Sequence, residues 1–193
     1  MKLGAVILAA GAGTRLGGVA KALLTARDGR TFLGAILANA RGAGLVESVA
    51  VVAPPYADIV AAKAAELGAR VVMNPHPERG MASSIALGFA ALAETDCDAA
   101  WLWPVDHPDV SPTTLRALVE ALGDHAAARP VFDGHGGHPP LVARALWPRL
   151  ADCAHLADGA RGVLASADTV AVPVNDAGVL RDIDTLEDAR AAR

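Results

Sequence analysis

Apolar segments alternate along the chain with segments in which apolar residues recur at helical spacing. Residues 3–10 form a continuous apolar run that ends in Gly11-Ala12-Gly13, which is typical of a strand buried on both faces of a parallel sheet. Further apolar runs predict strands at residues 47–53, 69–73 and 99–105, and shorter strands at 130–132, 141–142 and 169–174. Helices are predicted at residues 31–43, 56–67, 81–93, 111–122, 144–150 and 159–166, with a last helix beginning at Thr185.

The order of these elements predicts the fold class. Strand alternates with helix four times, which indicates βαβ units. We therefore predict an α/β fold, with residues 1–193 in a single domain and three layers (αβα) around a mostly parallel, Rossmann-like sheet. Residues 132–141, rich in Gly, His and Pro, are predicted to form a long loop over the sheet edge.

Composition narrows the class of protein. The chain has 193 residues, of which 53% are hydrophobic and 20% charged, so intrinsic disorder is excluded. A formal net charge of −4 argues against a nucleic-acid or anionic-membrane surface, and no apolar run approaches the roughly 18 residues of a membrane span. Cys97 and Cys153 lie far apart, as expected of a cytoplasmic protein without disulfides. Met1-Lys2 and the apolar run after it also have the outline of a signal peptide, but we interpret that run as the first strand.

A glycine-rich loop follows the first strand, at the position where open α/β sheets bind ligands. The dinucleotide fingerprint G-x-G-x-x-G fails at Leu16, and the phosphate-binding motif G-x-x-x-x-G-K fails at Val19. A glycine loop with two cations, Arg15 and Lys21, remains. Backbone N–H groups in such a loop can approach phosphate oxygens while the cations neutralise them. The alternative is a tight turn with a solvated arginine and lysine.

Acidic residues follow two later segments. Asp106 comes directly after the fourth predicted strand, where a carboxylate can hold Mg²⁺ against a phosphate; the alternative is a residue that caps a turn. If residues 179–183 are extended, Asp182 and Asp184 point to one face. Asp184 is expected instead to cap the last helix.

Histidines in the predicted loop 132–141 offer a different metal hypothesis. His135 and His138, with Asp133 nearby, have side chains that transition metals accept. Because no helix or strand is predicted to fix their geometry, the hypothesis at Asp106 is favoured.

Taken together, these motifs resemble the MobA-like and MocA-like nucleotidyltransferases of molybdenum-cofactor maturation, within the nucleotide-diphospho-sugar transferase-like fold. The resemblance covers nearly the whole chain, and Ala10 is closer to its cytidylyl-transferring members. Five segments carry it in the order of the chain: residues 8–24 (LAAGAGTRLGGVAKALL), 74–84 with Asn74-Pro75 and Gly80-Met81-x-Ser83-Ser84, 105–108 (VDHP), 137–139 (GHP) and 159–188.

The resemblance implies a reaction and a set of site residues. A phosphate on the acceptor attacks the α-phosphate of an NTP, and pyrophosphate leaves. Arg15, Lys21 and Asp106 are the implied catalytic residues, and Asp106 is the Mg²⁺ ligand, with Asp182 or Asp184 as its support. His107, which stands where many relatives have Gln, and His138 lie toward the acceptor. The implied nucleotide-binding residues are Leu8, Ala9, Ala10, Gly11, Gly13, Thr14, Arg15, Lys21, Asn74, Gly80 and Ser83.

Several functions remain open at this point. The favoured one is transfer of an NMP, from CTP, to the phosphate of molybdopterin, with transient contact to a molybdoenzyme or cofactor-synthesis protein. The same fold could instead act on a sugar phosphate or another phosphorylated small molecule, or could use GTP. A non-catalytic nucleotide- or cofactor-binding chaperone is the alternative from a different class. Arg15, Lys21 and Asp106 together argue against it, because a binding scaffold does not need all three.

Overall fold

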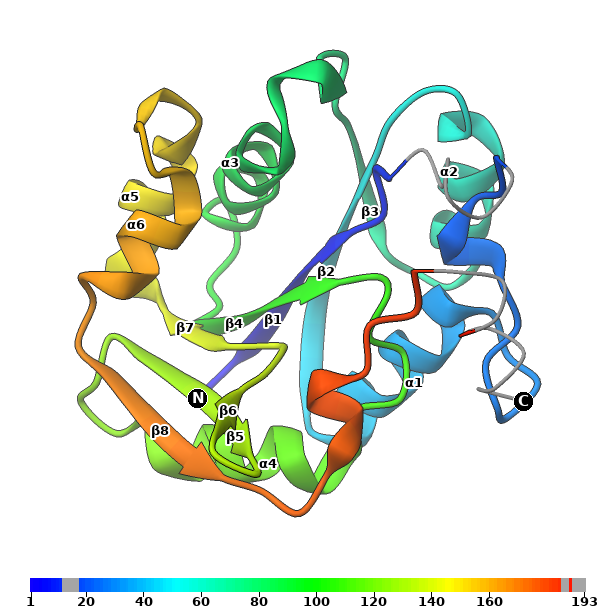
Figure 1. The fold of residues 1–193 in the computed structure, drawn as a ribbon. Helices are drawn as coiled ribbons and strands as arrows, with labels where there is room; N and C mark the ends of the chain where they lie inside the picture. Colours follow the sequence, from blue (N-terminus) through cyan, green and yellow to red (C-terminus); the bar gives the residue numbers. More distant parts are fainter. Residues whose placement is uncertain (12–17, 185–187, 189–193) are drawn as a thin grey trace.

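The computed structural model describes residues 1–11, 18–184 and 188, and it confirms the predicted three-layer α/β fold (Figure 1). Within the described residues, one sheet has the strand order β3-β2-β1-β4-β7-β5-β6, and β8 pairs with β5. The strands are β1 (Leu3–Leu8), β2 (Leu45–Val52), β3 (Arg70–Met73), β4 (Ala99–Pro104), β5 (Ala127–Phe132), β6 (His135–Gly136), β7 (Leu141–Ala143) and β8 (Thr169–Pro173).

The helices cover both faces of the sheet. Helices α1, α2 and α4 pack on one face, and α3, α5 and α6 pack on the other. The α-helices are α1 (Phe32–Gly42), α2 (Ala57–Glu66), α3 (Met81–Leu92), α4 (Pro112–Leu122), α5 (Trp147–Ala151) and α6 (Gly159–Ala165). Short 3₁₀ turns are η2 (Lys21–Leu23), η3 (Pro77–Arg79), η4 (Arg144–Leu146), η5 (Cys153–His155) and η6 (Ala177–Leu180). None of the helices among the described residues is long and apolar enough to span a membrane.

The continuous apolar run of β1 is explained by its central position. Its side chains alternate between the two faces, so Ala5 and Ile7 pack toward α1 while Val6 and Leu8 pack toward α3. Gly88 of α3 allows that helix to lie close against the sheet, because a Cβ there would stand 2.3 Å from Val6 Cγ1. A strand buried on both faces needs apolar residues at every position, as the sequence predicts.

Pairing is parallel for β3-β2-β1-β4 and for β5-β8, whereas β7 is antiparallel to both β4 and β5. The prediction of a mostly parallel sheet is therefore confirmed. The predicted loop 132–141 is wrong in part, because residues 135–136 form β6, which folds back on β5 as a hairpin. Asp133 and Gly134 make its turn with φ of 49° and 76°, the conformation that an Asp-Gly pair favours in a two-residue hairpin.

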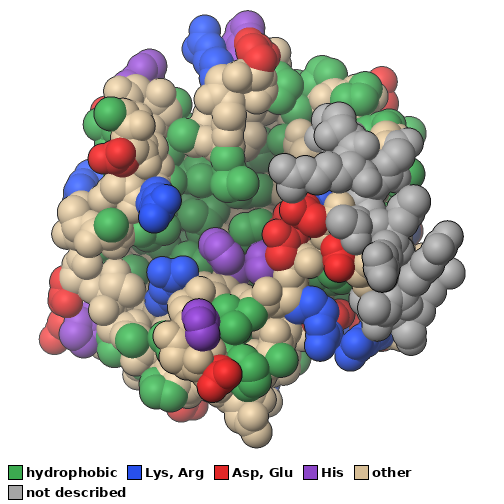
Figure 2. Space-filling model, in the orientation of Figure 1, with side chains coloured by type: hydrophobic (Ala, Val, Ile, Leu, Met, Phe, Trp, Pro, Cys, Tyr) green, Lys and Arg blue, Asp and Glu red, His purple; other side chains and the backbone are tan. Residues whose placement is uncertain are grey.

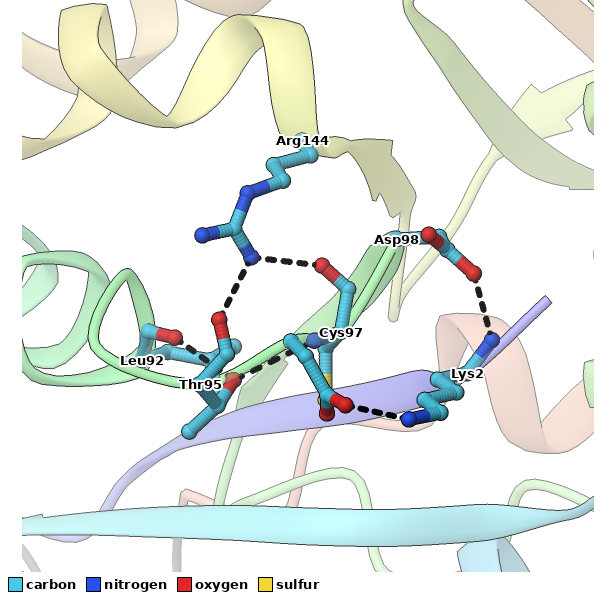
Figure 3. Close-up of polar contacts among 7 residues, drawn as sticks. Lys2, Leu92, Thr95, Cys97, Asp98 and Arg144 are labelled. Atoms are coloured by element: carbon cyan, nitrogen blue, oxygen red, sulfur yellow. Dashed lines mark hydrogen bonds and ion pairs between the residues drawn. The ribbon is translucent and has the colours of Figure 1, made fainter.

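Arg144 ties together the amino-terminal edge of the sheet (Figure 3). Its Nη1 donates to the carbonyl oxygens of Thr95 and Cys97, at 2.8 and 2.7 Å, and its Nη2 donates to Ala93 O at 2.9 Å. Carbonyls just after the end of α3 thereby gain partners that the helix itself cannot supply. The backbone N–H of Lys2 donates to Asp98 Oδ2 at 2.7 Å, which joins the starts of β1 and β4. These contacts stabilise the edge opposite the carboxyl ends of the strands.

Near the C-terminus the structure differs from the expectation of an extended segment at 179–183. Val179 and Leu180 belong to the 3₁₀ turn η6, because the Asp176 carboxylate accepts the Gly178 N–H at 3.0 Å and folds the chain there. The expected last helix falls mostly on residues 185–187 and 189–193, outside the described residues. Of the cap predicted at Asp184, the structure describes one bond, from its backbone N–H to Asp188 Oδ2 at 3.2 Å.

Candidate active site

The ends of β1 and β4 bring two predicted site segments side by side. These strands are parallel neighbours, with Leu8 opposite Pro104 in the register. Residues 9–11 and Asp106 therefore leave the same edge of the sheet, where ligands of open α/β sheets bind. The backbone N–H of Val105 donates to Leu8 O at 3.2 Å, which extends the pairing to the edge itself.

Lys21 is surrounded by carboxylates at this edge. Its Nζ lies 3.3 Å from Asp106 Oδ2 and forms a second ion pair with Asp184 Oδ1. The lysine side chain is only 12% exposed, so it is held in place and not free in solvent. Burial alone would lower the pKa of Lys21, but the hydrogen bonds and charges of Asp184 and Asp106 outweigh burial and raise it. Lys21 and Asp106, two of the implied catalytic residues, thus lie next to each other at this edge.

Asp182 lies near Asp106 and His107. One ligand atom from each of these three side chains lies within 4.8 Å of the other two. The segment is fixed against β4, because the backbone N–H of Ile183 donates to Asp106 O at 3.0 Å. Partial burial raises the pKa of Asp182, and the negative charges of Asp106 and Asp184 raise it further. A bound cation would relieve this repulsion.

His107 and His138 meet although they are far apart in the sequence. Their ring centroids are 5.0 Å apart, and the Nδ1 atom of each ring is buried without a hydrogen-bond partner among the described residues. The backbone N–H of His138 donates to Val179 O at 2.8 Å, so η6 positions this ring. Burial lowers the pKa of both histidines, that of His138 to about 4, so both rings are neutral at pH 7.

A cavity of about 430 Å³ opens beside the end of β1. Its volume is in the range of small-molecule sites. Figure 2 shows this face of the molecule hollowed, with hydrophobic walls and with histidine and acidic side chains gathered beside the hollow. The residues that line the cavity are Leu8, Ala10, Gly11, Pro54, Pro77, Glu78, Gly80, Met81 and Ser84.

Asn74 supports the wall of this cavity through hydrogen bonds to Ser83 and Ser84. It is 1% exposed, and its Nδ2 donates to Ser83 Oγ and Ser84 Oγ, both at 2.9 Å. Its Oδ1 accepts the backbone N–H of His76 at 2.9 Å, and Ser83 Oγ donates to Gly80 O at 2.7 Å. The network fixes the start of α3 against β3. Nucleotide contact by Asn74 and Ser83 stays a prediction, and the observed bonds give both residues a supporting role.

The donor set fits a divalent cation. Two carboxylates and an imidazole are ligand types that divalent metals accept, and the carboxylates repel each other without a cation. Among the described residues this is the one such group, so the alternative with His135, Asp133 and His138 is not supported. His135 lies exposed on β6, with its Nδ1 2.8 Å from Asp133 O.

Some predicted site residues lie outside the described residues, and some residues that line the cavity were not predicted from the sequence. Gly13, Thr14 and Arg15 fall in residues 12–17, so their roles remain predictions. Pro54, Pro77 and Glu78 line the cavity, yet they precede or follow strands without a motif that marks them. The hairpin that precedes His138 could have been found from its Asp-Gly pair.

A half-buried lysine and an acidic group at the carboxyl edge of an α/β sheet, after a glycine-rich sequence, point to a class of protein, the nucleotidyltransferases. The chain belongs to the family of the MobA-like NTP transferase domain, whose family model matches residues 5–171. The predicted family is thus confirmed.

Among curated relatives, a molybdenum cofactor guanylyltransferase of Acidiphilium cryptum is 35% identical over 147 residues, covering 76% of this chain and 67% of its own. A nicotine blue oxidoreductase of Paenarthrobacter nicotinovorans is 34% identical over 191 residues, covering 94% of this chain and 92% of its own. The chain is therefore similar to proteins with two differently named activities.

Solved structures share the fold over the whole chain. Rv0371c from Mycobacterium tuberculosis superposes with a TM-score of 0.84 at 30% identity, covering 99% of this chain and 97% of its own. A second structure of that protein, in complex with manganese, has a TM-score of 0.77 at 26% identity, with 100% and 98% covered.

Proposed function

We propose that this chain transfers a nucleoside monophosphate from an NTP to the phosphate of a small-molecule acceptor and releases pyrophosphate. CTP and molybdopterin are the first substrates to test, and residues 1–193 act as one domain. One observation carries the proposal: Lys21, Asp106 and Asp182 are grouped at the carboxyl edge of β1 and β4, beside a cavity that begins at Leu8.

The chemistry suits this grouping. An acceptor phosphate oxygen bonds to the α-phosphorus, and the bond from that phosphorus to the bridging oxygen of the departing pyrophosphate breaks. Lys21 carries a positive charge whose ammonium group can exchange its carboxylate partners for the phosphates, and Arg15 is proposed to bind the outer phosphates. Asp106 with Asp182 would hold Mg²⁺, which supplies charge neutralisation at the phosphates.

The neighbouring surfaces accommodate the two substrates. The cavity between residues 8–11 and the start of α3 is proposed to take the base and ribose, with Ala10 and Gly80 in its wall. The neutral rings of His107 and His138 are proposed to face the acceptor on the other side of Asp106. Because NTPs are kept in the cytoplasm, we place the reaction there, with transient delivery of the product to a molybdoenzyme or cofactor-synthesis protein.

A pyrophosphate-release assay tests the proposal. CTP, GTP, ATP and UTP are each combined with molybdopterin and with several sugar phosphates, and we expect CTP with molybdopterin to give the highest turnover. A preference for GTP would agree with the activity named for the Acidiphilium relative and would show that Ala10 does not select the base. Turnover with a sugar phosphate but not with molybdopterin would show that the acceptor is a sugar phosphate and that the proposed type of reaction is correct. Binding without pyrophosphate release from any pair would favour the chaperone.

A second candidate function comes from the other relative. The nicotine blue oxidoreductase covers nearly the whole chain, which favours testing reduction of a dye-like acceptor by NADH or NADPH. Loss of absorbance at 340 nm upon addition of a quinoid dye measures this activity. We expect none, because the dinucleotide fingerprint fails at Leu16. Steady oxidation of NAD(P)H in the absence of any NTP would favour the oxidoreductase function over nucleotidyl transfer.

A further inference from the structure

His107 is held in one position beside two carboxylates. Its backbone O accepts the indole N–H of the fully buried Trp103 at 2.9 Å, and its backbone N–H donates to Pro104 O at 3.3 Å. The side chain is 9% exposed, and the His138 ring lies against it. The imidazole therefore has little freedom to turn away from Asp106 and Asp182.

The ring of His107 is not hydrogen-bonded to Asp106, although it lies beside that carboxylate. Its Nδ1 is buried without a partner, and its Nε2 lies 3.9 Å from Asp106 Oδ1, beyond the roughly 3.2 Å limit of a hydrogen bond. A buried polar atom without a partner destabilises the fold, so an imidazole at this place needs an explanation. Packing in the hydrophobic core does not explain the His107 ring, because the ring faces the carboxylates at the open edge of the sheet.

The separations are slightly wider than those of ligands on one ion. Two ligand atoms on opposite sides of a cation, with bonds of about 2.1–2.3 Å, stand about 4.2–4.6 Å apart. The nitrogen and the two carboxylate oxygens lie within 4.8 Å of one another, so a small closing movement would bring all three onto one cation. Asp184 is engaged with Lys21, which leaves Asp182 as the second carboxylate.

We propose that His107 is a nitrogen ligand of a divalent first-row transition-metal ion, with Asp106 and Asp182 as oxygen ligands, so that this site binds Mn²⁺ more tightly than Mg²⁺. Mg²⁺ takes oxygen ligands almost exclusively, and an imidazole gives it little. The transition metals accept imidazole readily, and their affinities for such mixed sites increase along the series that begins with Mn²⁺. The inference concerns the ion of the proposed reaction, but it depends only on metal binding.

Mn²⁺ binding without nucleotide tests the proposal. Titration of the intact chain followed by the EPR signal of free Mn²⁺ gives the affinity, and competition with Mg²⁺ gives the preference. We expect one Mn²⁺ per chain, displaced only by a large excess of Mg²⁺. His107→Gln should weaken Mn²⁺ binding about tenfold or more and change Mg²⁺ binding much less. His135→Gln, in an exposed histidine on β6, is the matched control and should bind Mn²⁺ like the wild type.

Pulsed EPR of the wild-type chain reports the ligand directly and does not depend on whether His107→Gln folds. Bound Mn²⁺ should show coupling to a histidine nitrogen that changes when the histidines carry ¹⁵N and that disappears in His107→Gln. Absence of that coupling, unchanged Mn²⁺ affinity in a folded His107→Gln, or no Mn²⁺ binding at all would each overturn the proposal. The pyrophosphate assay has separate outcomes, so failure of the proposed function would be seen independently.

Discussion

Lys21 Nζ lies 3.3 Å from Asp106 Oδ2, although the two residues are 85 positions apart in the chain. The lysine comes from the turn η2 after the glycine loop, and the aspartate follows β4. In this arrangement the protein itself supplies a cation to the carboxylate that is expected to hold the metal. Binding of a metal–NTP complex would exchange this ion pair for one between Lys21 and phosphate.

Asp106→Asn should abolish nucleotidyl transfer and preserve the fold. Lys21 keeps its ion pair with Asp184, and Asp182 loses a repelling neighbour, so the melting temperature should change little. Turnover should fall about a hundredfold or more, because metal-assisted charge stabilisation is worth several kcal/mol. Pyrophosphate release and thermal melting are measured on the same preparation.

Asp98→Asn is the matched control for that variant, because Asp98 lies just before the other end of β4 and accepts a backbone N–H from Lys2. It should retain transfer. An Asp106→Asn enzyme that is active but destabilised would show that Asp106 caps a turn and holds no metal.

Asn74→Ala should weaken both stability and NTP binding. The change leaves the His76 N–H without its acceptor and removes the donor to the Ser83 and Ser84 hydroxyls, which costs about 1–3 kcal/mol of the free energy of unfolding. The start of α3 then loosens, and with it the wall of the cavity. Urea denaturation and NTP titration measure the two effects.

Asn39→Ala separates the two effects, because the Asn39 Nδ2 also donates two hydrogen bonds, to the carbonyl oxygens of Pro108 and Val110, but Asn39 does not line this cavity. It should lower stability and leave NTP affinity unchanged. Equal NTP affinities in both variants would show that Asn74 does not support the NTP-binding site.

Gly137→Ala should be far more damaging than Gly136→Ala. A Cβ at Gly137 would stand 2.5 Å from the backbone oxygen of Val179, so η6 and the following Asp182 must shift. At Gly136 the nearest atoms belong to the Arg129 guanidinium, 2.6 Å away, and this side chain can swing aside. Overpacking against backbone costs about 1–3 kcal/mol.

Guanidinium denaturation and Mn²⁺ titration measure the pair. Gly137→Ala should lose stability and metal affinity together, whereas Gly136→Ala should lose only a little stability. Equal effects would indicate that the contact with Val179 does not position Asp182.

Acid should destabilise the metal-free protein through His138. Its pKa is about 4 in the folded state, mainly because of burial, against about 6.5 in the unfolded chain. Between these values the unfolded chain binds a proton that the folded chain does not, so stability falls as the pH falls from 6.5 to 4. The loss reaches at most about 3 kcal/mol for this group, and the lowered pKa of His107 acts in the same direction.

Urea denaturation in EDTA at several pH values measures this dependence. His138→Gln should make the stability less dependent on pH in that range. The hypothesis fails if the variant and the wild type lose stability in parallel.

The sequence by itself determined the layered fold and the edge at which the site lies. Apolar runs without alternation, as in residues 3–10, require burial on both faces, and helices between such strands require parallel pairing. The ends of the first and fourth predicted strands therefore mark both the glycine loop and Asp106 as site segments. These conclusions depend on local periodicity, which a single chain displays directly.

Only the tertiary structure decided which side chains meet at that edge. Lys21 with Asp184, and His107 with His138, are pairs that depend on strand order and on the turn η6, neither of which local periodicity encodes. The antiparallel pairing of β7 with β4 and β5 could not be predicted for the same reason, since a three-residue strand carries too little sequence pattern to reveal its partners. The separation of Asp182 from Asp184, one beside His107 and the other on Lys21, was fixed because the chain turns at Asp176 and then pairs through Ile183 with Asp106.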